Sequence, residues 1–352
     1  MIPIIIPAYE PDERMLDLLD TMKKSGLGPV VIVDDGSGAS YADIFSRAQS
    51  YVQVLGGAVL THEVNRGKGR ALKTAFAHVL ETYPDASGCV TADSDGQHSA
   101  ECIRSVMQAL EADPDKLILG VRRFDGEGVP WKSRVGNGIT ERVFSYISGI
   151  HVTDTQTGLR GIPRAFMKEL LDVPGERFEF ETRMLLESAG RYPIVEVPIQ
   201  TIYDSEDNHQ THFNTFTDSV KIYRILADRF LKYAFASVSS CAIDLALFAL
   251  FCHIFRGRLG GYIAVSTVLA RVISAVYNYL INYRVVFRSR QKISVSGTRY
   301  FLLAVVQMGL SALLVTAGNS LLPFLPEVVV KAVVDTVLFF ISYKIQQKYV
   351  FR

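Results

Sequence analysis

The second part of the chain contains four long apolar segments, and these constrain its fold more than any other feature. The segments cover roughly 233–255, 262–283, 300–322 and 327–347. Each is close to the ~20 residues that a helix needs to cross the hydrocarbon core of a bilayer. We therefore expect an all-α, four-helix transmembrane domain over residues 233–352.

The charge of the chain is distributed unevenly, although the formal net charge is only +1. Residues 230–352 contain 13 Lys and Arg against 3 acidic residues, which leaves 24 basic and 33 acidic residues upstream from totals of 37 and 36. The downstream basic residues flank apolar segments and form no continuous patch. This distribution indicates a soluble domain joined to a membrane domain, and it argues against nucleic acid as a partner.

The basic residues also predict an orientation. Only Arg256 and Arg258 fall in the loops on the far side of the apolar segments. The near side carries nine, namely Lys232, Arg284, Arg288, Arg290, Lys292, Arg299, Lys344, Lys348 and Arg352. The positive-inside rule therefore places both termini in the cytoplasm and the protein in the cell (inner) membrane. The start, "MIPIIIPAYE", has no Lys or Arg before its apolar residues and is typical of a strand, not of a signal peptide.

Three further features of the downstream part carry predictions. Residues 214–232 have an apolar and a charged face, which predicts an interfacial amphipathic helix or, alternatively, a helix packed on the soluble domain. "YRVVFR" at 283 recurs as "QKYVFR" at 347, and "KYAFASV" at 232 resembles "RYFLLAV" at 299, so a helical hairpin is duplicated. Asp244 with Arg271, and Lys331 with Asp335, would pair inside the apolar segments, either to fix the bundle or to line a path for a lipid headgroup.

Residues 1–213 alternate between strand and helix patterns. "IPIIIP", "PVVIVDD", "GCVTAD" and "KLILGVR" are typical of strands, and residues 11–26 have helical periodicity. This order predicts an α/β domain with a doubly wound, mostly parallel sheet. Ligands of such sheets bind beyond the carboxyl ends of the strands.

The stretch "TADSDGQHS" places Asp93, Asp95 and Gln97 on alternate positions directly after one of these strands. If the chain stays extended, the three side chains share a face. Two carboxylates and an amide oxygen suit Mg²⁺ or Mn²⁺. The alternative is an Asp-Gly turn that closes a hairpin.

Four motifs in order, "IIIPAYE", "VVIVDDGS", "NRGKGRALKTAF" and "ADSDGQH", resemble family 2 glycosyltransferases. Within that family the chain looks most like the polyprenyl-phosphate sugar synthases, such as dolichol-phosphate mannose synthase. The resemblance implies a GT-A-type domain that uses a UDP- or GDP-sugar, a divalent cation and a polyprenyl phosphate. The membrane part resembles the GtrA-like domain, and the pattern is compatible with a homo-oligomer.

The resemblance also implies roles for individual residues. Asp93 and Asp95 would hold the cation, with Gln97 as a third ligand. Lys68 and Arg70 would hold the donor or, alternatively, be solvated loop cations. Asp154 in "DTQTGLRG" would shape the site, and Glu179 and Glu181 match the family's acidic stretch or, equally, favour a helix N-terminus. The nucleotide would be surrounded by Pro7, Tyr9, Glu10 and Asp35, and the acceptor phosphate by Arg122 and Arg134.

Many family 2 enzymes that glycosylate hydroxyls have a QxxRW signature and an aspartate general base, whereas the nearest stretch here, "DTQTGLRG", has no tryptophan. A phosphate acceptor would explain the missing base. A phosphate monoester is largely ionised at neutral pH, with a second pKa of about 6, so it needs no general base. Direct attack would invert the anomeric configuration. The alternatives are transfer to another lipid such as diacylglycerol, or a lipid transporter or scaffold with a regulatory nucleotide-binding domain.

Overall fold

The computed structural model describes residues 1–122, 144–146, 148–200, 215–258, 261–287, 289, 291–321, 324 and 326–351. The chain divides into two compact units, Met1–Ile225 and Leu226–Arg352. The division falls inside the segment that we expected to lie at the membrane surface. Arg134, a predicted ligand of the acceptor phosphate, lies outside the described residues.

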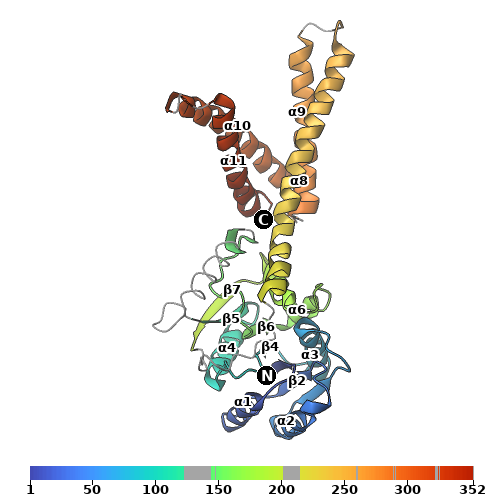
Figure 1. The fold of residues 1–352 in the computed structure, drawn as a ribbon, viewed down its shortest axis with the longest axis vertical. Helices are drawn as coiled ribbons and strands as arrows, with labels where there is room; N and C mark the ends of the chain where they lie inside the picture. The colour runs from blue at the N-terminus through green and yellow to red at the C-terminus, as the bar shows by residue number, and fades with distance from the viewer. Residues whose placement is uncertain are drawn as a thin grey trace. The chain divides into compact units, whose positions relative to one another are not determined.

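A mixed seven-stranded sheet is the framework of the first unit (Figure 1). Its strand order is β3-β2-β1-β4-β6-β5-β7, and β6 alone runs antiparallel to its neighbours β4 and β5. The strands are β1 Ile4–Ala8, β2 Val30–Asp34, β3 Ala58–Thr61, β4 Gly88–Thr91, β5 Leu117–Arg122, β6 Arg160–Pro163 and β7 Ile194–Ile199. The predicted α/β class and mostly parallel sheet are confirmed.

Two groups of helices cover the sheet. Ile4 and Ile6 of β1 join a buried core with α1, α2 and α4, whereas α3 packs on β1 and β2 from the face to which the alternating Ile5 points. The helix α3 in turn contacts α6 and α7. These helices are α1 Glu13–Lys24, α2 Ala42–Leu55 (after a 3₁₀ turn at Ala39–Tyr41), α3 Lys68–Thr82, α4 Ala100–Ala112, α6 Arg164–Leu170 and α7 Glu179–Ser188.

The register of the central strands brings their carboxyl ends to one edge. Ala8 pairs with Asp34, and Ile5 pairs with Thr91, in parallel ladders. Backbone hydrogen bonds extend this pairing, because Asp35 N donates to Ala8 O at 2.8 Å and Ala92 N donates to Ile5 O at 2.9 Å. The predicted donor and metal residues therefore follow strands that end side by side.

The second unit is helical. Helix α8, Thr215–Phe255, is continuous for 41 residues, so the expected interfacial helix and the first apolar segment form one helix. It is followed by α9 Tyr262–Ile281, α10 Ile293–Leu321 and α11 Glu327–Ile345. One turn of π-helix extends α9 at Asn282–Val286, and another extends α11 at Gln346–Val350.

Among the described residues, three helices are long and apolar enough to cross a membrane: 227–255, 262–286 and 293–321. Large apolar side chains stay exposed along them, such as Met308 and Leu313, each 70% exposed. We expected a fourth span at 327–347. Helix α11 occupies that place, but Lys331, Asp335 and Lys344 lie within its 19 residues, and its spanning role stays a prediction.

The duplicated hairpin predicted from the sequence is visible as two matching sets of aromatic contacts. The repeat equates Tyr233 with Tyr300, Phe287 with Phe351, and Tyr343 with Tyr279. Ring centroids lie 6.2 Å apart for Tyr233–Phe287 and 6.1 Å for Tyr300–Phe351. They lie 5.0 Å apart for Tyr233–Tyr343 and 5.4 Å for Tyr300–Tyr279, while Phe287–Tyr343 and Phe351–Tyr279 are both 5.8 Å. Phe287 stacks on Phe351 at 5.1 Å, as expected where two copies pack about a local two-fold axis.

The predicted intramembrane ion pairs are also present. Arg271 Nη2 lies 3.2 Å from Asp244 Oδ2 across α8 and α9, and Lys331 Nζ lies 2.8 Å from Asp335 Oδ2 within α11. The repeat equates Asp244 with Ser311 and Arg271 with Asp335. Ser311 Oγ donates to Asp335 Oδ1 at 2.6 Å, so each hairpin carries a polar contact between its two helices at the same position.

Candidate active site

Asp93 lies two residues beyond β4, at the edge where β1 and β2 also end. The alternating pattern led us to expect an extended chain at this point, but the chain is not extended. It turns at 94–96, where Gly96 has a φ of 76°, and Asp95 Oδ1 accepts the Gln97 N–H at 3.0 Å. The Asp-Gly turn of the alternative expectation is therefore present, but it leads into α4 and not into a hairpin, and the expected extended segment was wrong. The three predicted metal ligands lie on one turn.

The donor set of this turn fits a hard divalent cation. Burial raises the pKa of the Asp95 carboxyl, and the charge of Asp93 raises it further, so the two carboxylates act on each other electrostatically. A cation between them would relieve that repulsion. No three His, Cys, Asp or Glu side chains gather as a metal site in the described ranges. The candidate set is therefore two carboxylates completed by the amide oxygen of Gln97.

Lys68, the first residue of α3, contacts Asp93 and Glu181 together. Its Nζ lies 2.7 Å from Asp93 Oδ1 and 3.1 Å from Glu181 Oε2. Burial opposes the charge of the ammonium, but the two carboxylates outweigh burial and hold the pKa of Lys68 above its ordinary value. Burial would raise the pKa of Asp93, but the charge of Lys68 and a hydrogen bond from His98 hold it well below its usual range. His98 Nε2 is 3.6 Å from Asp93 Oδ2.

The glycines beside Lys68 serve close packing. A Cβ on Gly67 would lie 2.4 Å from Glu176 O, and one on Gly69 would lie 2.6 Å from the Phe180 Cβ. The Arg70 N–H donates to Gly67 O and to Glu176 O, so it is already engaged by the protein. The Arg70 side chain pairs with Glu176, with Nη2 donating to Oε1 at 2.8 Å. The segment 176–180 thus covers the start of α3, and Arg70 is not a solvated loop cation.

Asp35 organises the loop that carries Lys68. Its Oδ1 lies 2.7 Å from His62 Nδ1 and accepts the Arg66 N–H at 3.0 Å, while its Oδ2 accepts the Gly67 N–H at 2.7 Å. The Asp35 side chain is only 3% exposed. We predicted contact between Asp35 and the nucleotide, and that stays a prediction. In the structure the carboxylate fixes residues 66–67 against the end of β2.

The other predicted donor residues follow β1. Pro7 is buried in the strand and pairs in register with Val33. Glu10 has a φ of 49°, and its N–H donates to Ser37 Oγ at 2.8 Å, which ties the end of β1 to the loop after β2. A hydrogen bond to Glu10 raises the pKa of Tyr9, and burial adds to it. These residues lie at the same sheet edge as Asp93.

Two residues that sequence reasoning did not assign support Asp93 and Glu181. A Cβ on Gly158 would lie 2.1 Å from Asp93 Oδ2, so only glycine lets the carboxylate rest there. Arg160 is 1% exposed and donates to Thr157 O at 2.9 Å and to Glu181 O at 2.8 Å. A charged residue between the apolar residues of "GLRGI" was the available signal for Arg160. The two residues fix the backbone around the site.

Arg122 and Asp154 meet beyond β5. Arg122 Nε donates to Asp154 Oδ2 at 2.7 Å, and Arg122 Nη2 donates to Asp154 Oδ1 at 3.0 Å. Asp154 also accepts the Gln156 N–H at 3.1 Å and is 2% exposed. Both oxygens of this carboxylate are therefore engaged by its own surroundings.

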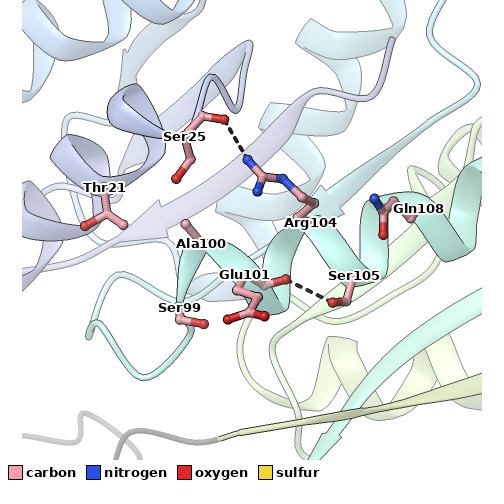
Figure 2. A pocket seen from close by; sticks show the side chains of 8 residues that line it. All are labelled: Thr21, Ser25, Ser99, Ala100, Glu101, Arg104, Ser105 and Gln108. Atoms are coloured by element: carbon pink, nitrogen blue, oxygen red, sulfur yellow. Dashed lines mark hydrogen bonds between the residues drawn. The ribbon is translucent and has the colours of Figure 1, made fainter.

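A surface groove of about 500 Å³ lies elsewhere, between α1 and α4 (Figure 2). Arg104 Nη2 donates across it to Ser25 O at 2.7 Å. Its lining is Thr21, Ser25, Ser99, Ala100, Glu101, Arg104, Ser105 and Gln108. None of the predicted site residues lines this groove.

Both parts of the chain match known protein families. Residues 4–171 match the family model "Glycosyl transferase family 2", and residues 215–351 match "GtrA/DPMS, transmembrane domain". A UDP-N-acetylglucosamine–dolichyl-phosphate N-acetylglucosaminyltransferase of Methanococcus voltae is 27% identical over 218 residues, 58% of this chain and 86% of that one. A dolichyl-phosphate hexose transferase of Haloferax volcanii is 28% identical over 202 residues, 56% and 80%. A mannosyltransferase structure from Pyrobaculum calidifontis, in complex with GDP-Man and Mn²⁺, has a TM-score of 0.42 at 16% identity, over 99% of this chain and 87% of that one.

Proposed function

The chain is a membrane-bound glycosyltransferase with a family 2 catalytic domain and a GtrA/DPMS transmembrane domain, and from this premise we propose a specific reaction. It moves one sugar from a nucleoside-diphosphate sugar to a polyprenyl phosphate at the cytoplasmic membrane face, with inversion at the anomeric carbon. The observation that carries the proposal is the contact between Lys68, at the start of α3, and Asp93, which with Asp95 follows β4 at the sheet edge. Relatives named as dolichyl-phosphate glycosyltransferases support the acceptor class.

The donor binds along the ends of β1, β2 and β4. Tyr9 and Glu10 contact the nucleoside, and the Asp35 carboxylate keeps the 66–67 backbone in place beside it. Lys68 supplies positive charge next to the diphosphate. Asp93, Asp95 and Gln97 would hold Mg²⁺ or Mn²⁺, which when bound would act as a Lewis acid toward the leaving diphosphate.

The acceptor phosphate binds on the opposite side of the sugar. Arg122 and Arg134 are proposed to donate to its oxygens, because the planar guanidinium matches a phosphate with two parallel hydrogen bonds. Asp154 holds Arg122 by both oxygens and so acts as a positioning residue, with neither oxygen directed to an acceptor hydroxyl. A phosphate oxygen is already a nucleophile near neutral pH, since the second pKa of a phosphate monoester is about 6. Positioning behind the anomeric carbon is then the main task of the protein.

A panel of acceptors tests this function. The detergent-solubilised full chain is incubated with labelled nucleotide-sugars, Mn²⁺ and one lipid at a time: a polyprenyl phosphate, the matching polyprenol, or diacylglycerol. We expect labelled lipid with the phosphate alone. Labelled diacylglycerol without any labelled polyprenyl phosphate would support the other-lipid alternative and overturn the proposal. Binding of nucleotide-sugar without transfer to any of the three would instead favour a regulatory domain.

A further inference from the structure

The Lys68 ammonium binds the same carboxylate, that of Asp93, that a metal ion would bind. Its ammonium is 2.7 Å from Asp93 Oδ1 and 3.1 Å from Glu181 Oε2, and the side chains of Lys68 and Glu181 are 18% and 11% exposed. A divalent cation bound to Asp93 would stand within a few ångströms of this ammonium. Like charges that approach closely in a partly buried site repel each other more strongly than in water, so the ammonium and the cation oppose each other.

We propose that Lys68 is an internal counter-cation of Asp93, and that Glu181 receives its ammonium when a divalent cation binds. This inference rests on the proposed metal site. Lys68 pairs with Asp93 while the cation is absent and thereby weakens binding of a free cation. Glu181 gives the ammonium a second partner, so that Asp93 is released without leaving a buried charge unpaired.

The surrounding backbone is built so that only the lysine side chain has to move. Gly67 and Gly69 let the start of α3 pack directly on residues 176–180. The carbonyl of Glu181 accepts a hydrogen bond from the buried Arg160 at 2.8 Å. Close packing therefore holds the backbone at Lys68, a hydrogen bond holds it at Glu181, and the ammonium lies within reach of both carboxylates.

The consequence is coupling between donor and cation. In the donor-free protein, Lys68 opposes the cation. The negative charge of a bound diphosphate attracts both the cation and Lys68. The donor and the cation therefore each bind more tightly when the other is present. Removing Lys68 should therefore tighten cation binding in the absence of donor and reduce the extra tightening that a nucleoside diphosphate produces.

Mn²⁺ binding by the full chain in detergent, followed by electron paramagnetic resonance, tests the proposal without using activity. Without nucleotide, we expect Lys68→Met to tighten Mn²⁺ binding at least about tenfold, and Glu181→Gln to weaken it about three- to tenfold. Lys68→Arg keeps the charge and should bind like the wild type. Lys73→Met is the matched control, because Lys73 is buried on the same helix but its ammonium pairs with Glu176, at 3.2 Å. This variant should change the affinity for Mn²⁺ less than about twofold.

The double variant Lys68→Met/Glu181→Gln separates the mechanism from simple charge addition. If Glu181 acts through Lys68, the double variant should match Lys68→Met, because the ammonium that Glu181 receives is absent. Additive effects in the double variant would overturn the proposal, as would unchanged or weaker Mn²⁺ binding in Lys68→Met. If the wild type and all variants bind no Mn²⁺ even with nucleoside diphosphate, the proposed metal site fails and this inference fails with it. Circular dichroism identifies any variant that has lost its fold. If Lys68→Met does not fold, Lys68→Arg still tests whether the positive charge sets the affinity for Mn²⁺.

Discussion

Asp154 binds Arg122 through both of its oxygens, at 2.7 and 3.0 Å, and so fixes a guanidinium just beyond the end of β5. Because Asp154 is only 2% exposed, its hydrogen bonds to Arg122 are shielded from competing water. The first prediction follows from this relationship.

Arg122→Ala should lower the catalytic efficiency toward the lipid phosphate about 10- to 150-fold, since a hydrogen bond to a charged group contributes roughly 1.5–3 kcal/mol. Asp154→Asn should lower it as well, because the guanidinium loses its fixed partner. Donor affinity should barely change in either variant. Steady-state kinetics with varied acceptor, together with nucleotide titration, give the measurement, and Arg104→Ala at the distant groove is the control. A collapse of donor binding with normal acceptor kinetics would contradict the assignment.

The second prediction concerns the carboxylates after β4. Asp95→Asn should lower transfer by at least about 100-fold, because the leaving diphosphate loses the charge compensation that the cation would supply. Chelation with EDTA should abolish transfer, and added Mg²⁺ or Mn²⁺ should restore it. Circular dichroism should show an intact fold. Transfer that survives thorough chelation would remove the cation from the account.

The third prediction uses the close approach of Gly158 to Asp93. In Gly158→Ala the new methyl group would stand 2.1 Å from Asp93 Oδ2, so the carboxylate must move away. We expect a loss of transfer of at least about tenfold, with weaker Mn²⁺ binding, while the thermal midpoint changes little. Gly309→Ala is the control, since nothing lies within 4 Å of the Cβ that it would add. Normal activity in Gly158→Ala would show that Asp93 is not needed in its present position.

The contact between Gly158 and Asp93 is a feature that the sequence did not reveal. The order of strands and the edge where Asp35 and Asp93 gather were predictable, because short apolar runs bounded by turn residues alternate with a helical pattern. The strands β3, β6 and β7 were missed. The strand β6 is four residues long and contains Arg160, whose burial depends on carbonyl acceptors supplied by distant segments.

The local conformation at the site was predicted least well. Alternation of Asp93, Asp95 and Gln97 favoured an extended segment, but the Asp95 side chain closes a turn that Gly96 permits. The purpose of Gly67 and Gly69 was also not predicted, because the absence of their side chains leaves room for residues 176–180. Both outcomes depend on long-range packing, which periodicity and motif spacing do not contain. In the membrane unit, by contrast, helix depth alone predicted the Asp244–Arg271 pair.

The fourth prediction concerns that pair. Asp244→Asn or Arg271→Gln alone should destabilise the detergent-solubilised chain, because each leaves one charge unpaired where a central Arg or Asp costs about 2.5–3.5 kcal/mol on insertion scales. The double variant should recover part of the loss, and transfer should persist. Thermal unfolding of the four proteins measures this, with Arg258→Gln as a loop control. Additive destabilisation in the double variant would mean that the two side chains do not stabilise each other.

In the proposed reaction, an oxygen of the lipid phosphate replaces the nucleoside diphosphate at the anomeric carbon of the sugar. Mass spectrometry of both products, after reaction of the wild-type chain with a nucleotide-sugar and an ¹⁸O-labelled polyprenyl phosphate, tests it most directly. We expect a lipid with one phosphate and one sugar, complete retention of the label, and release of the nucleoside diphosphate. A lipid diphosphate together with nucleoside monophosphate, or a sugar on a lipid hydroxyl, would contradict it.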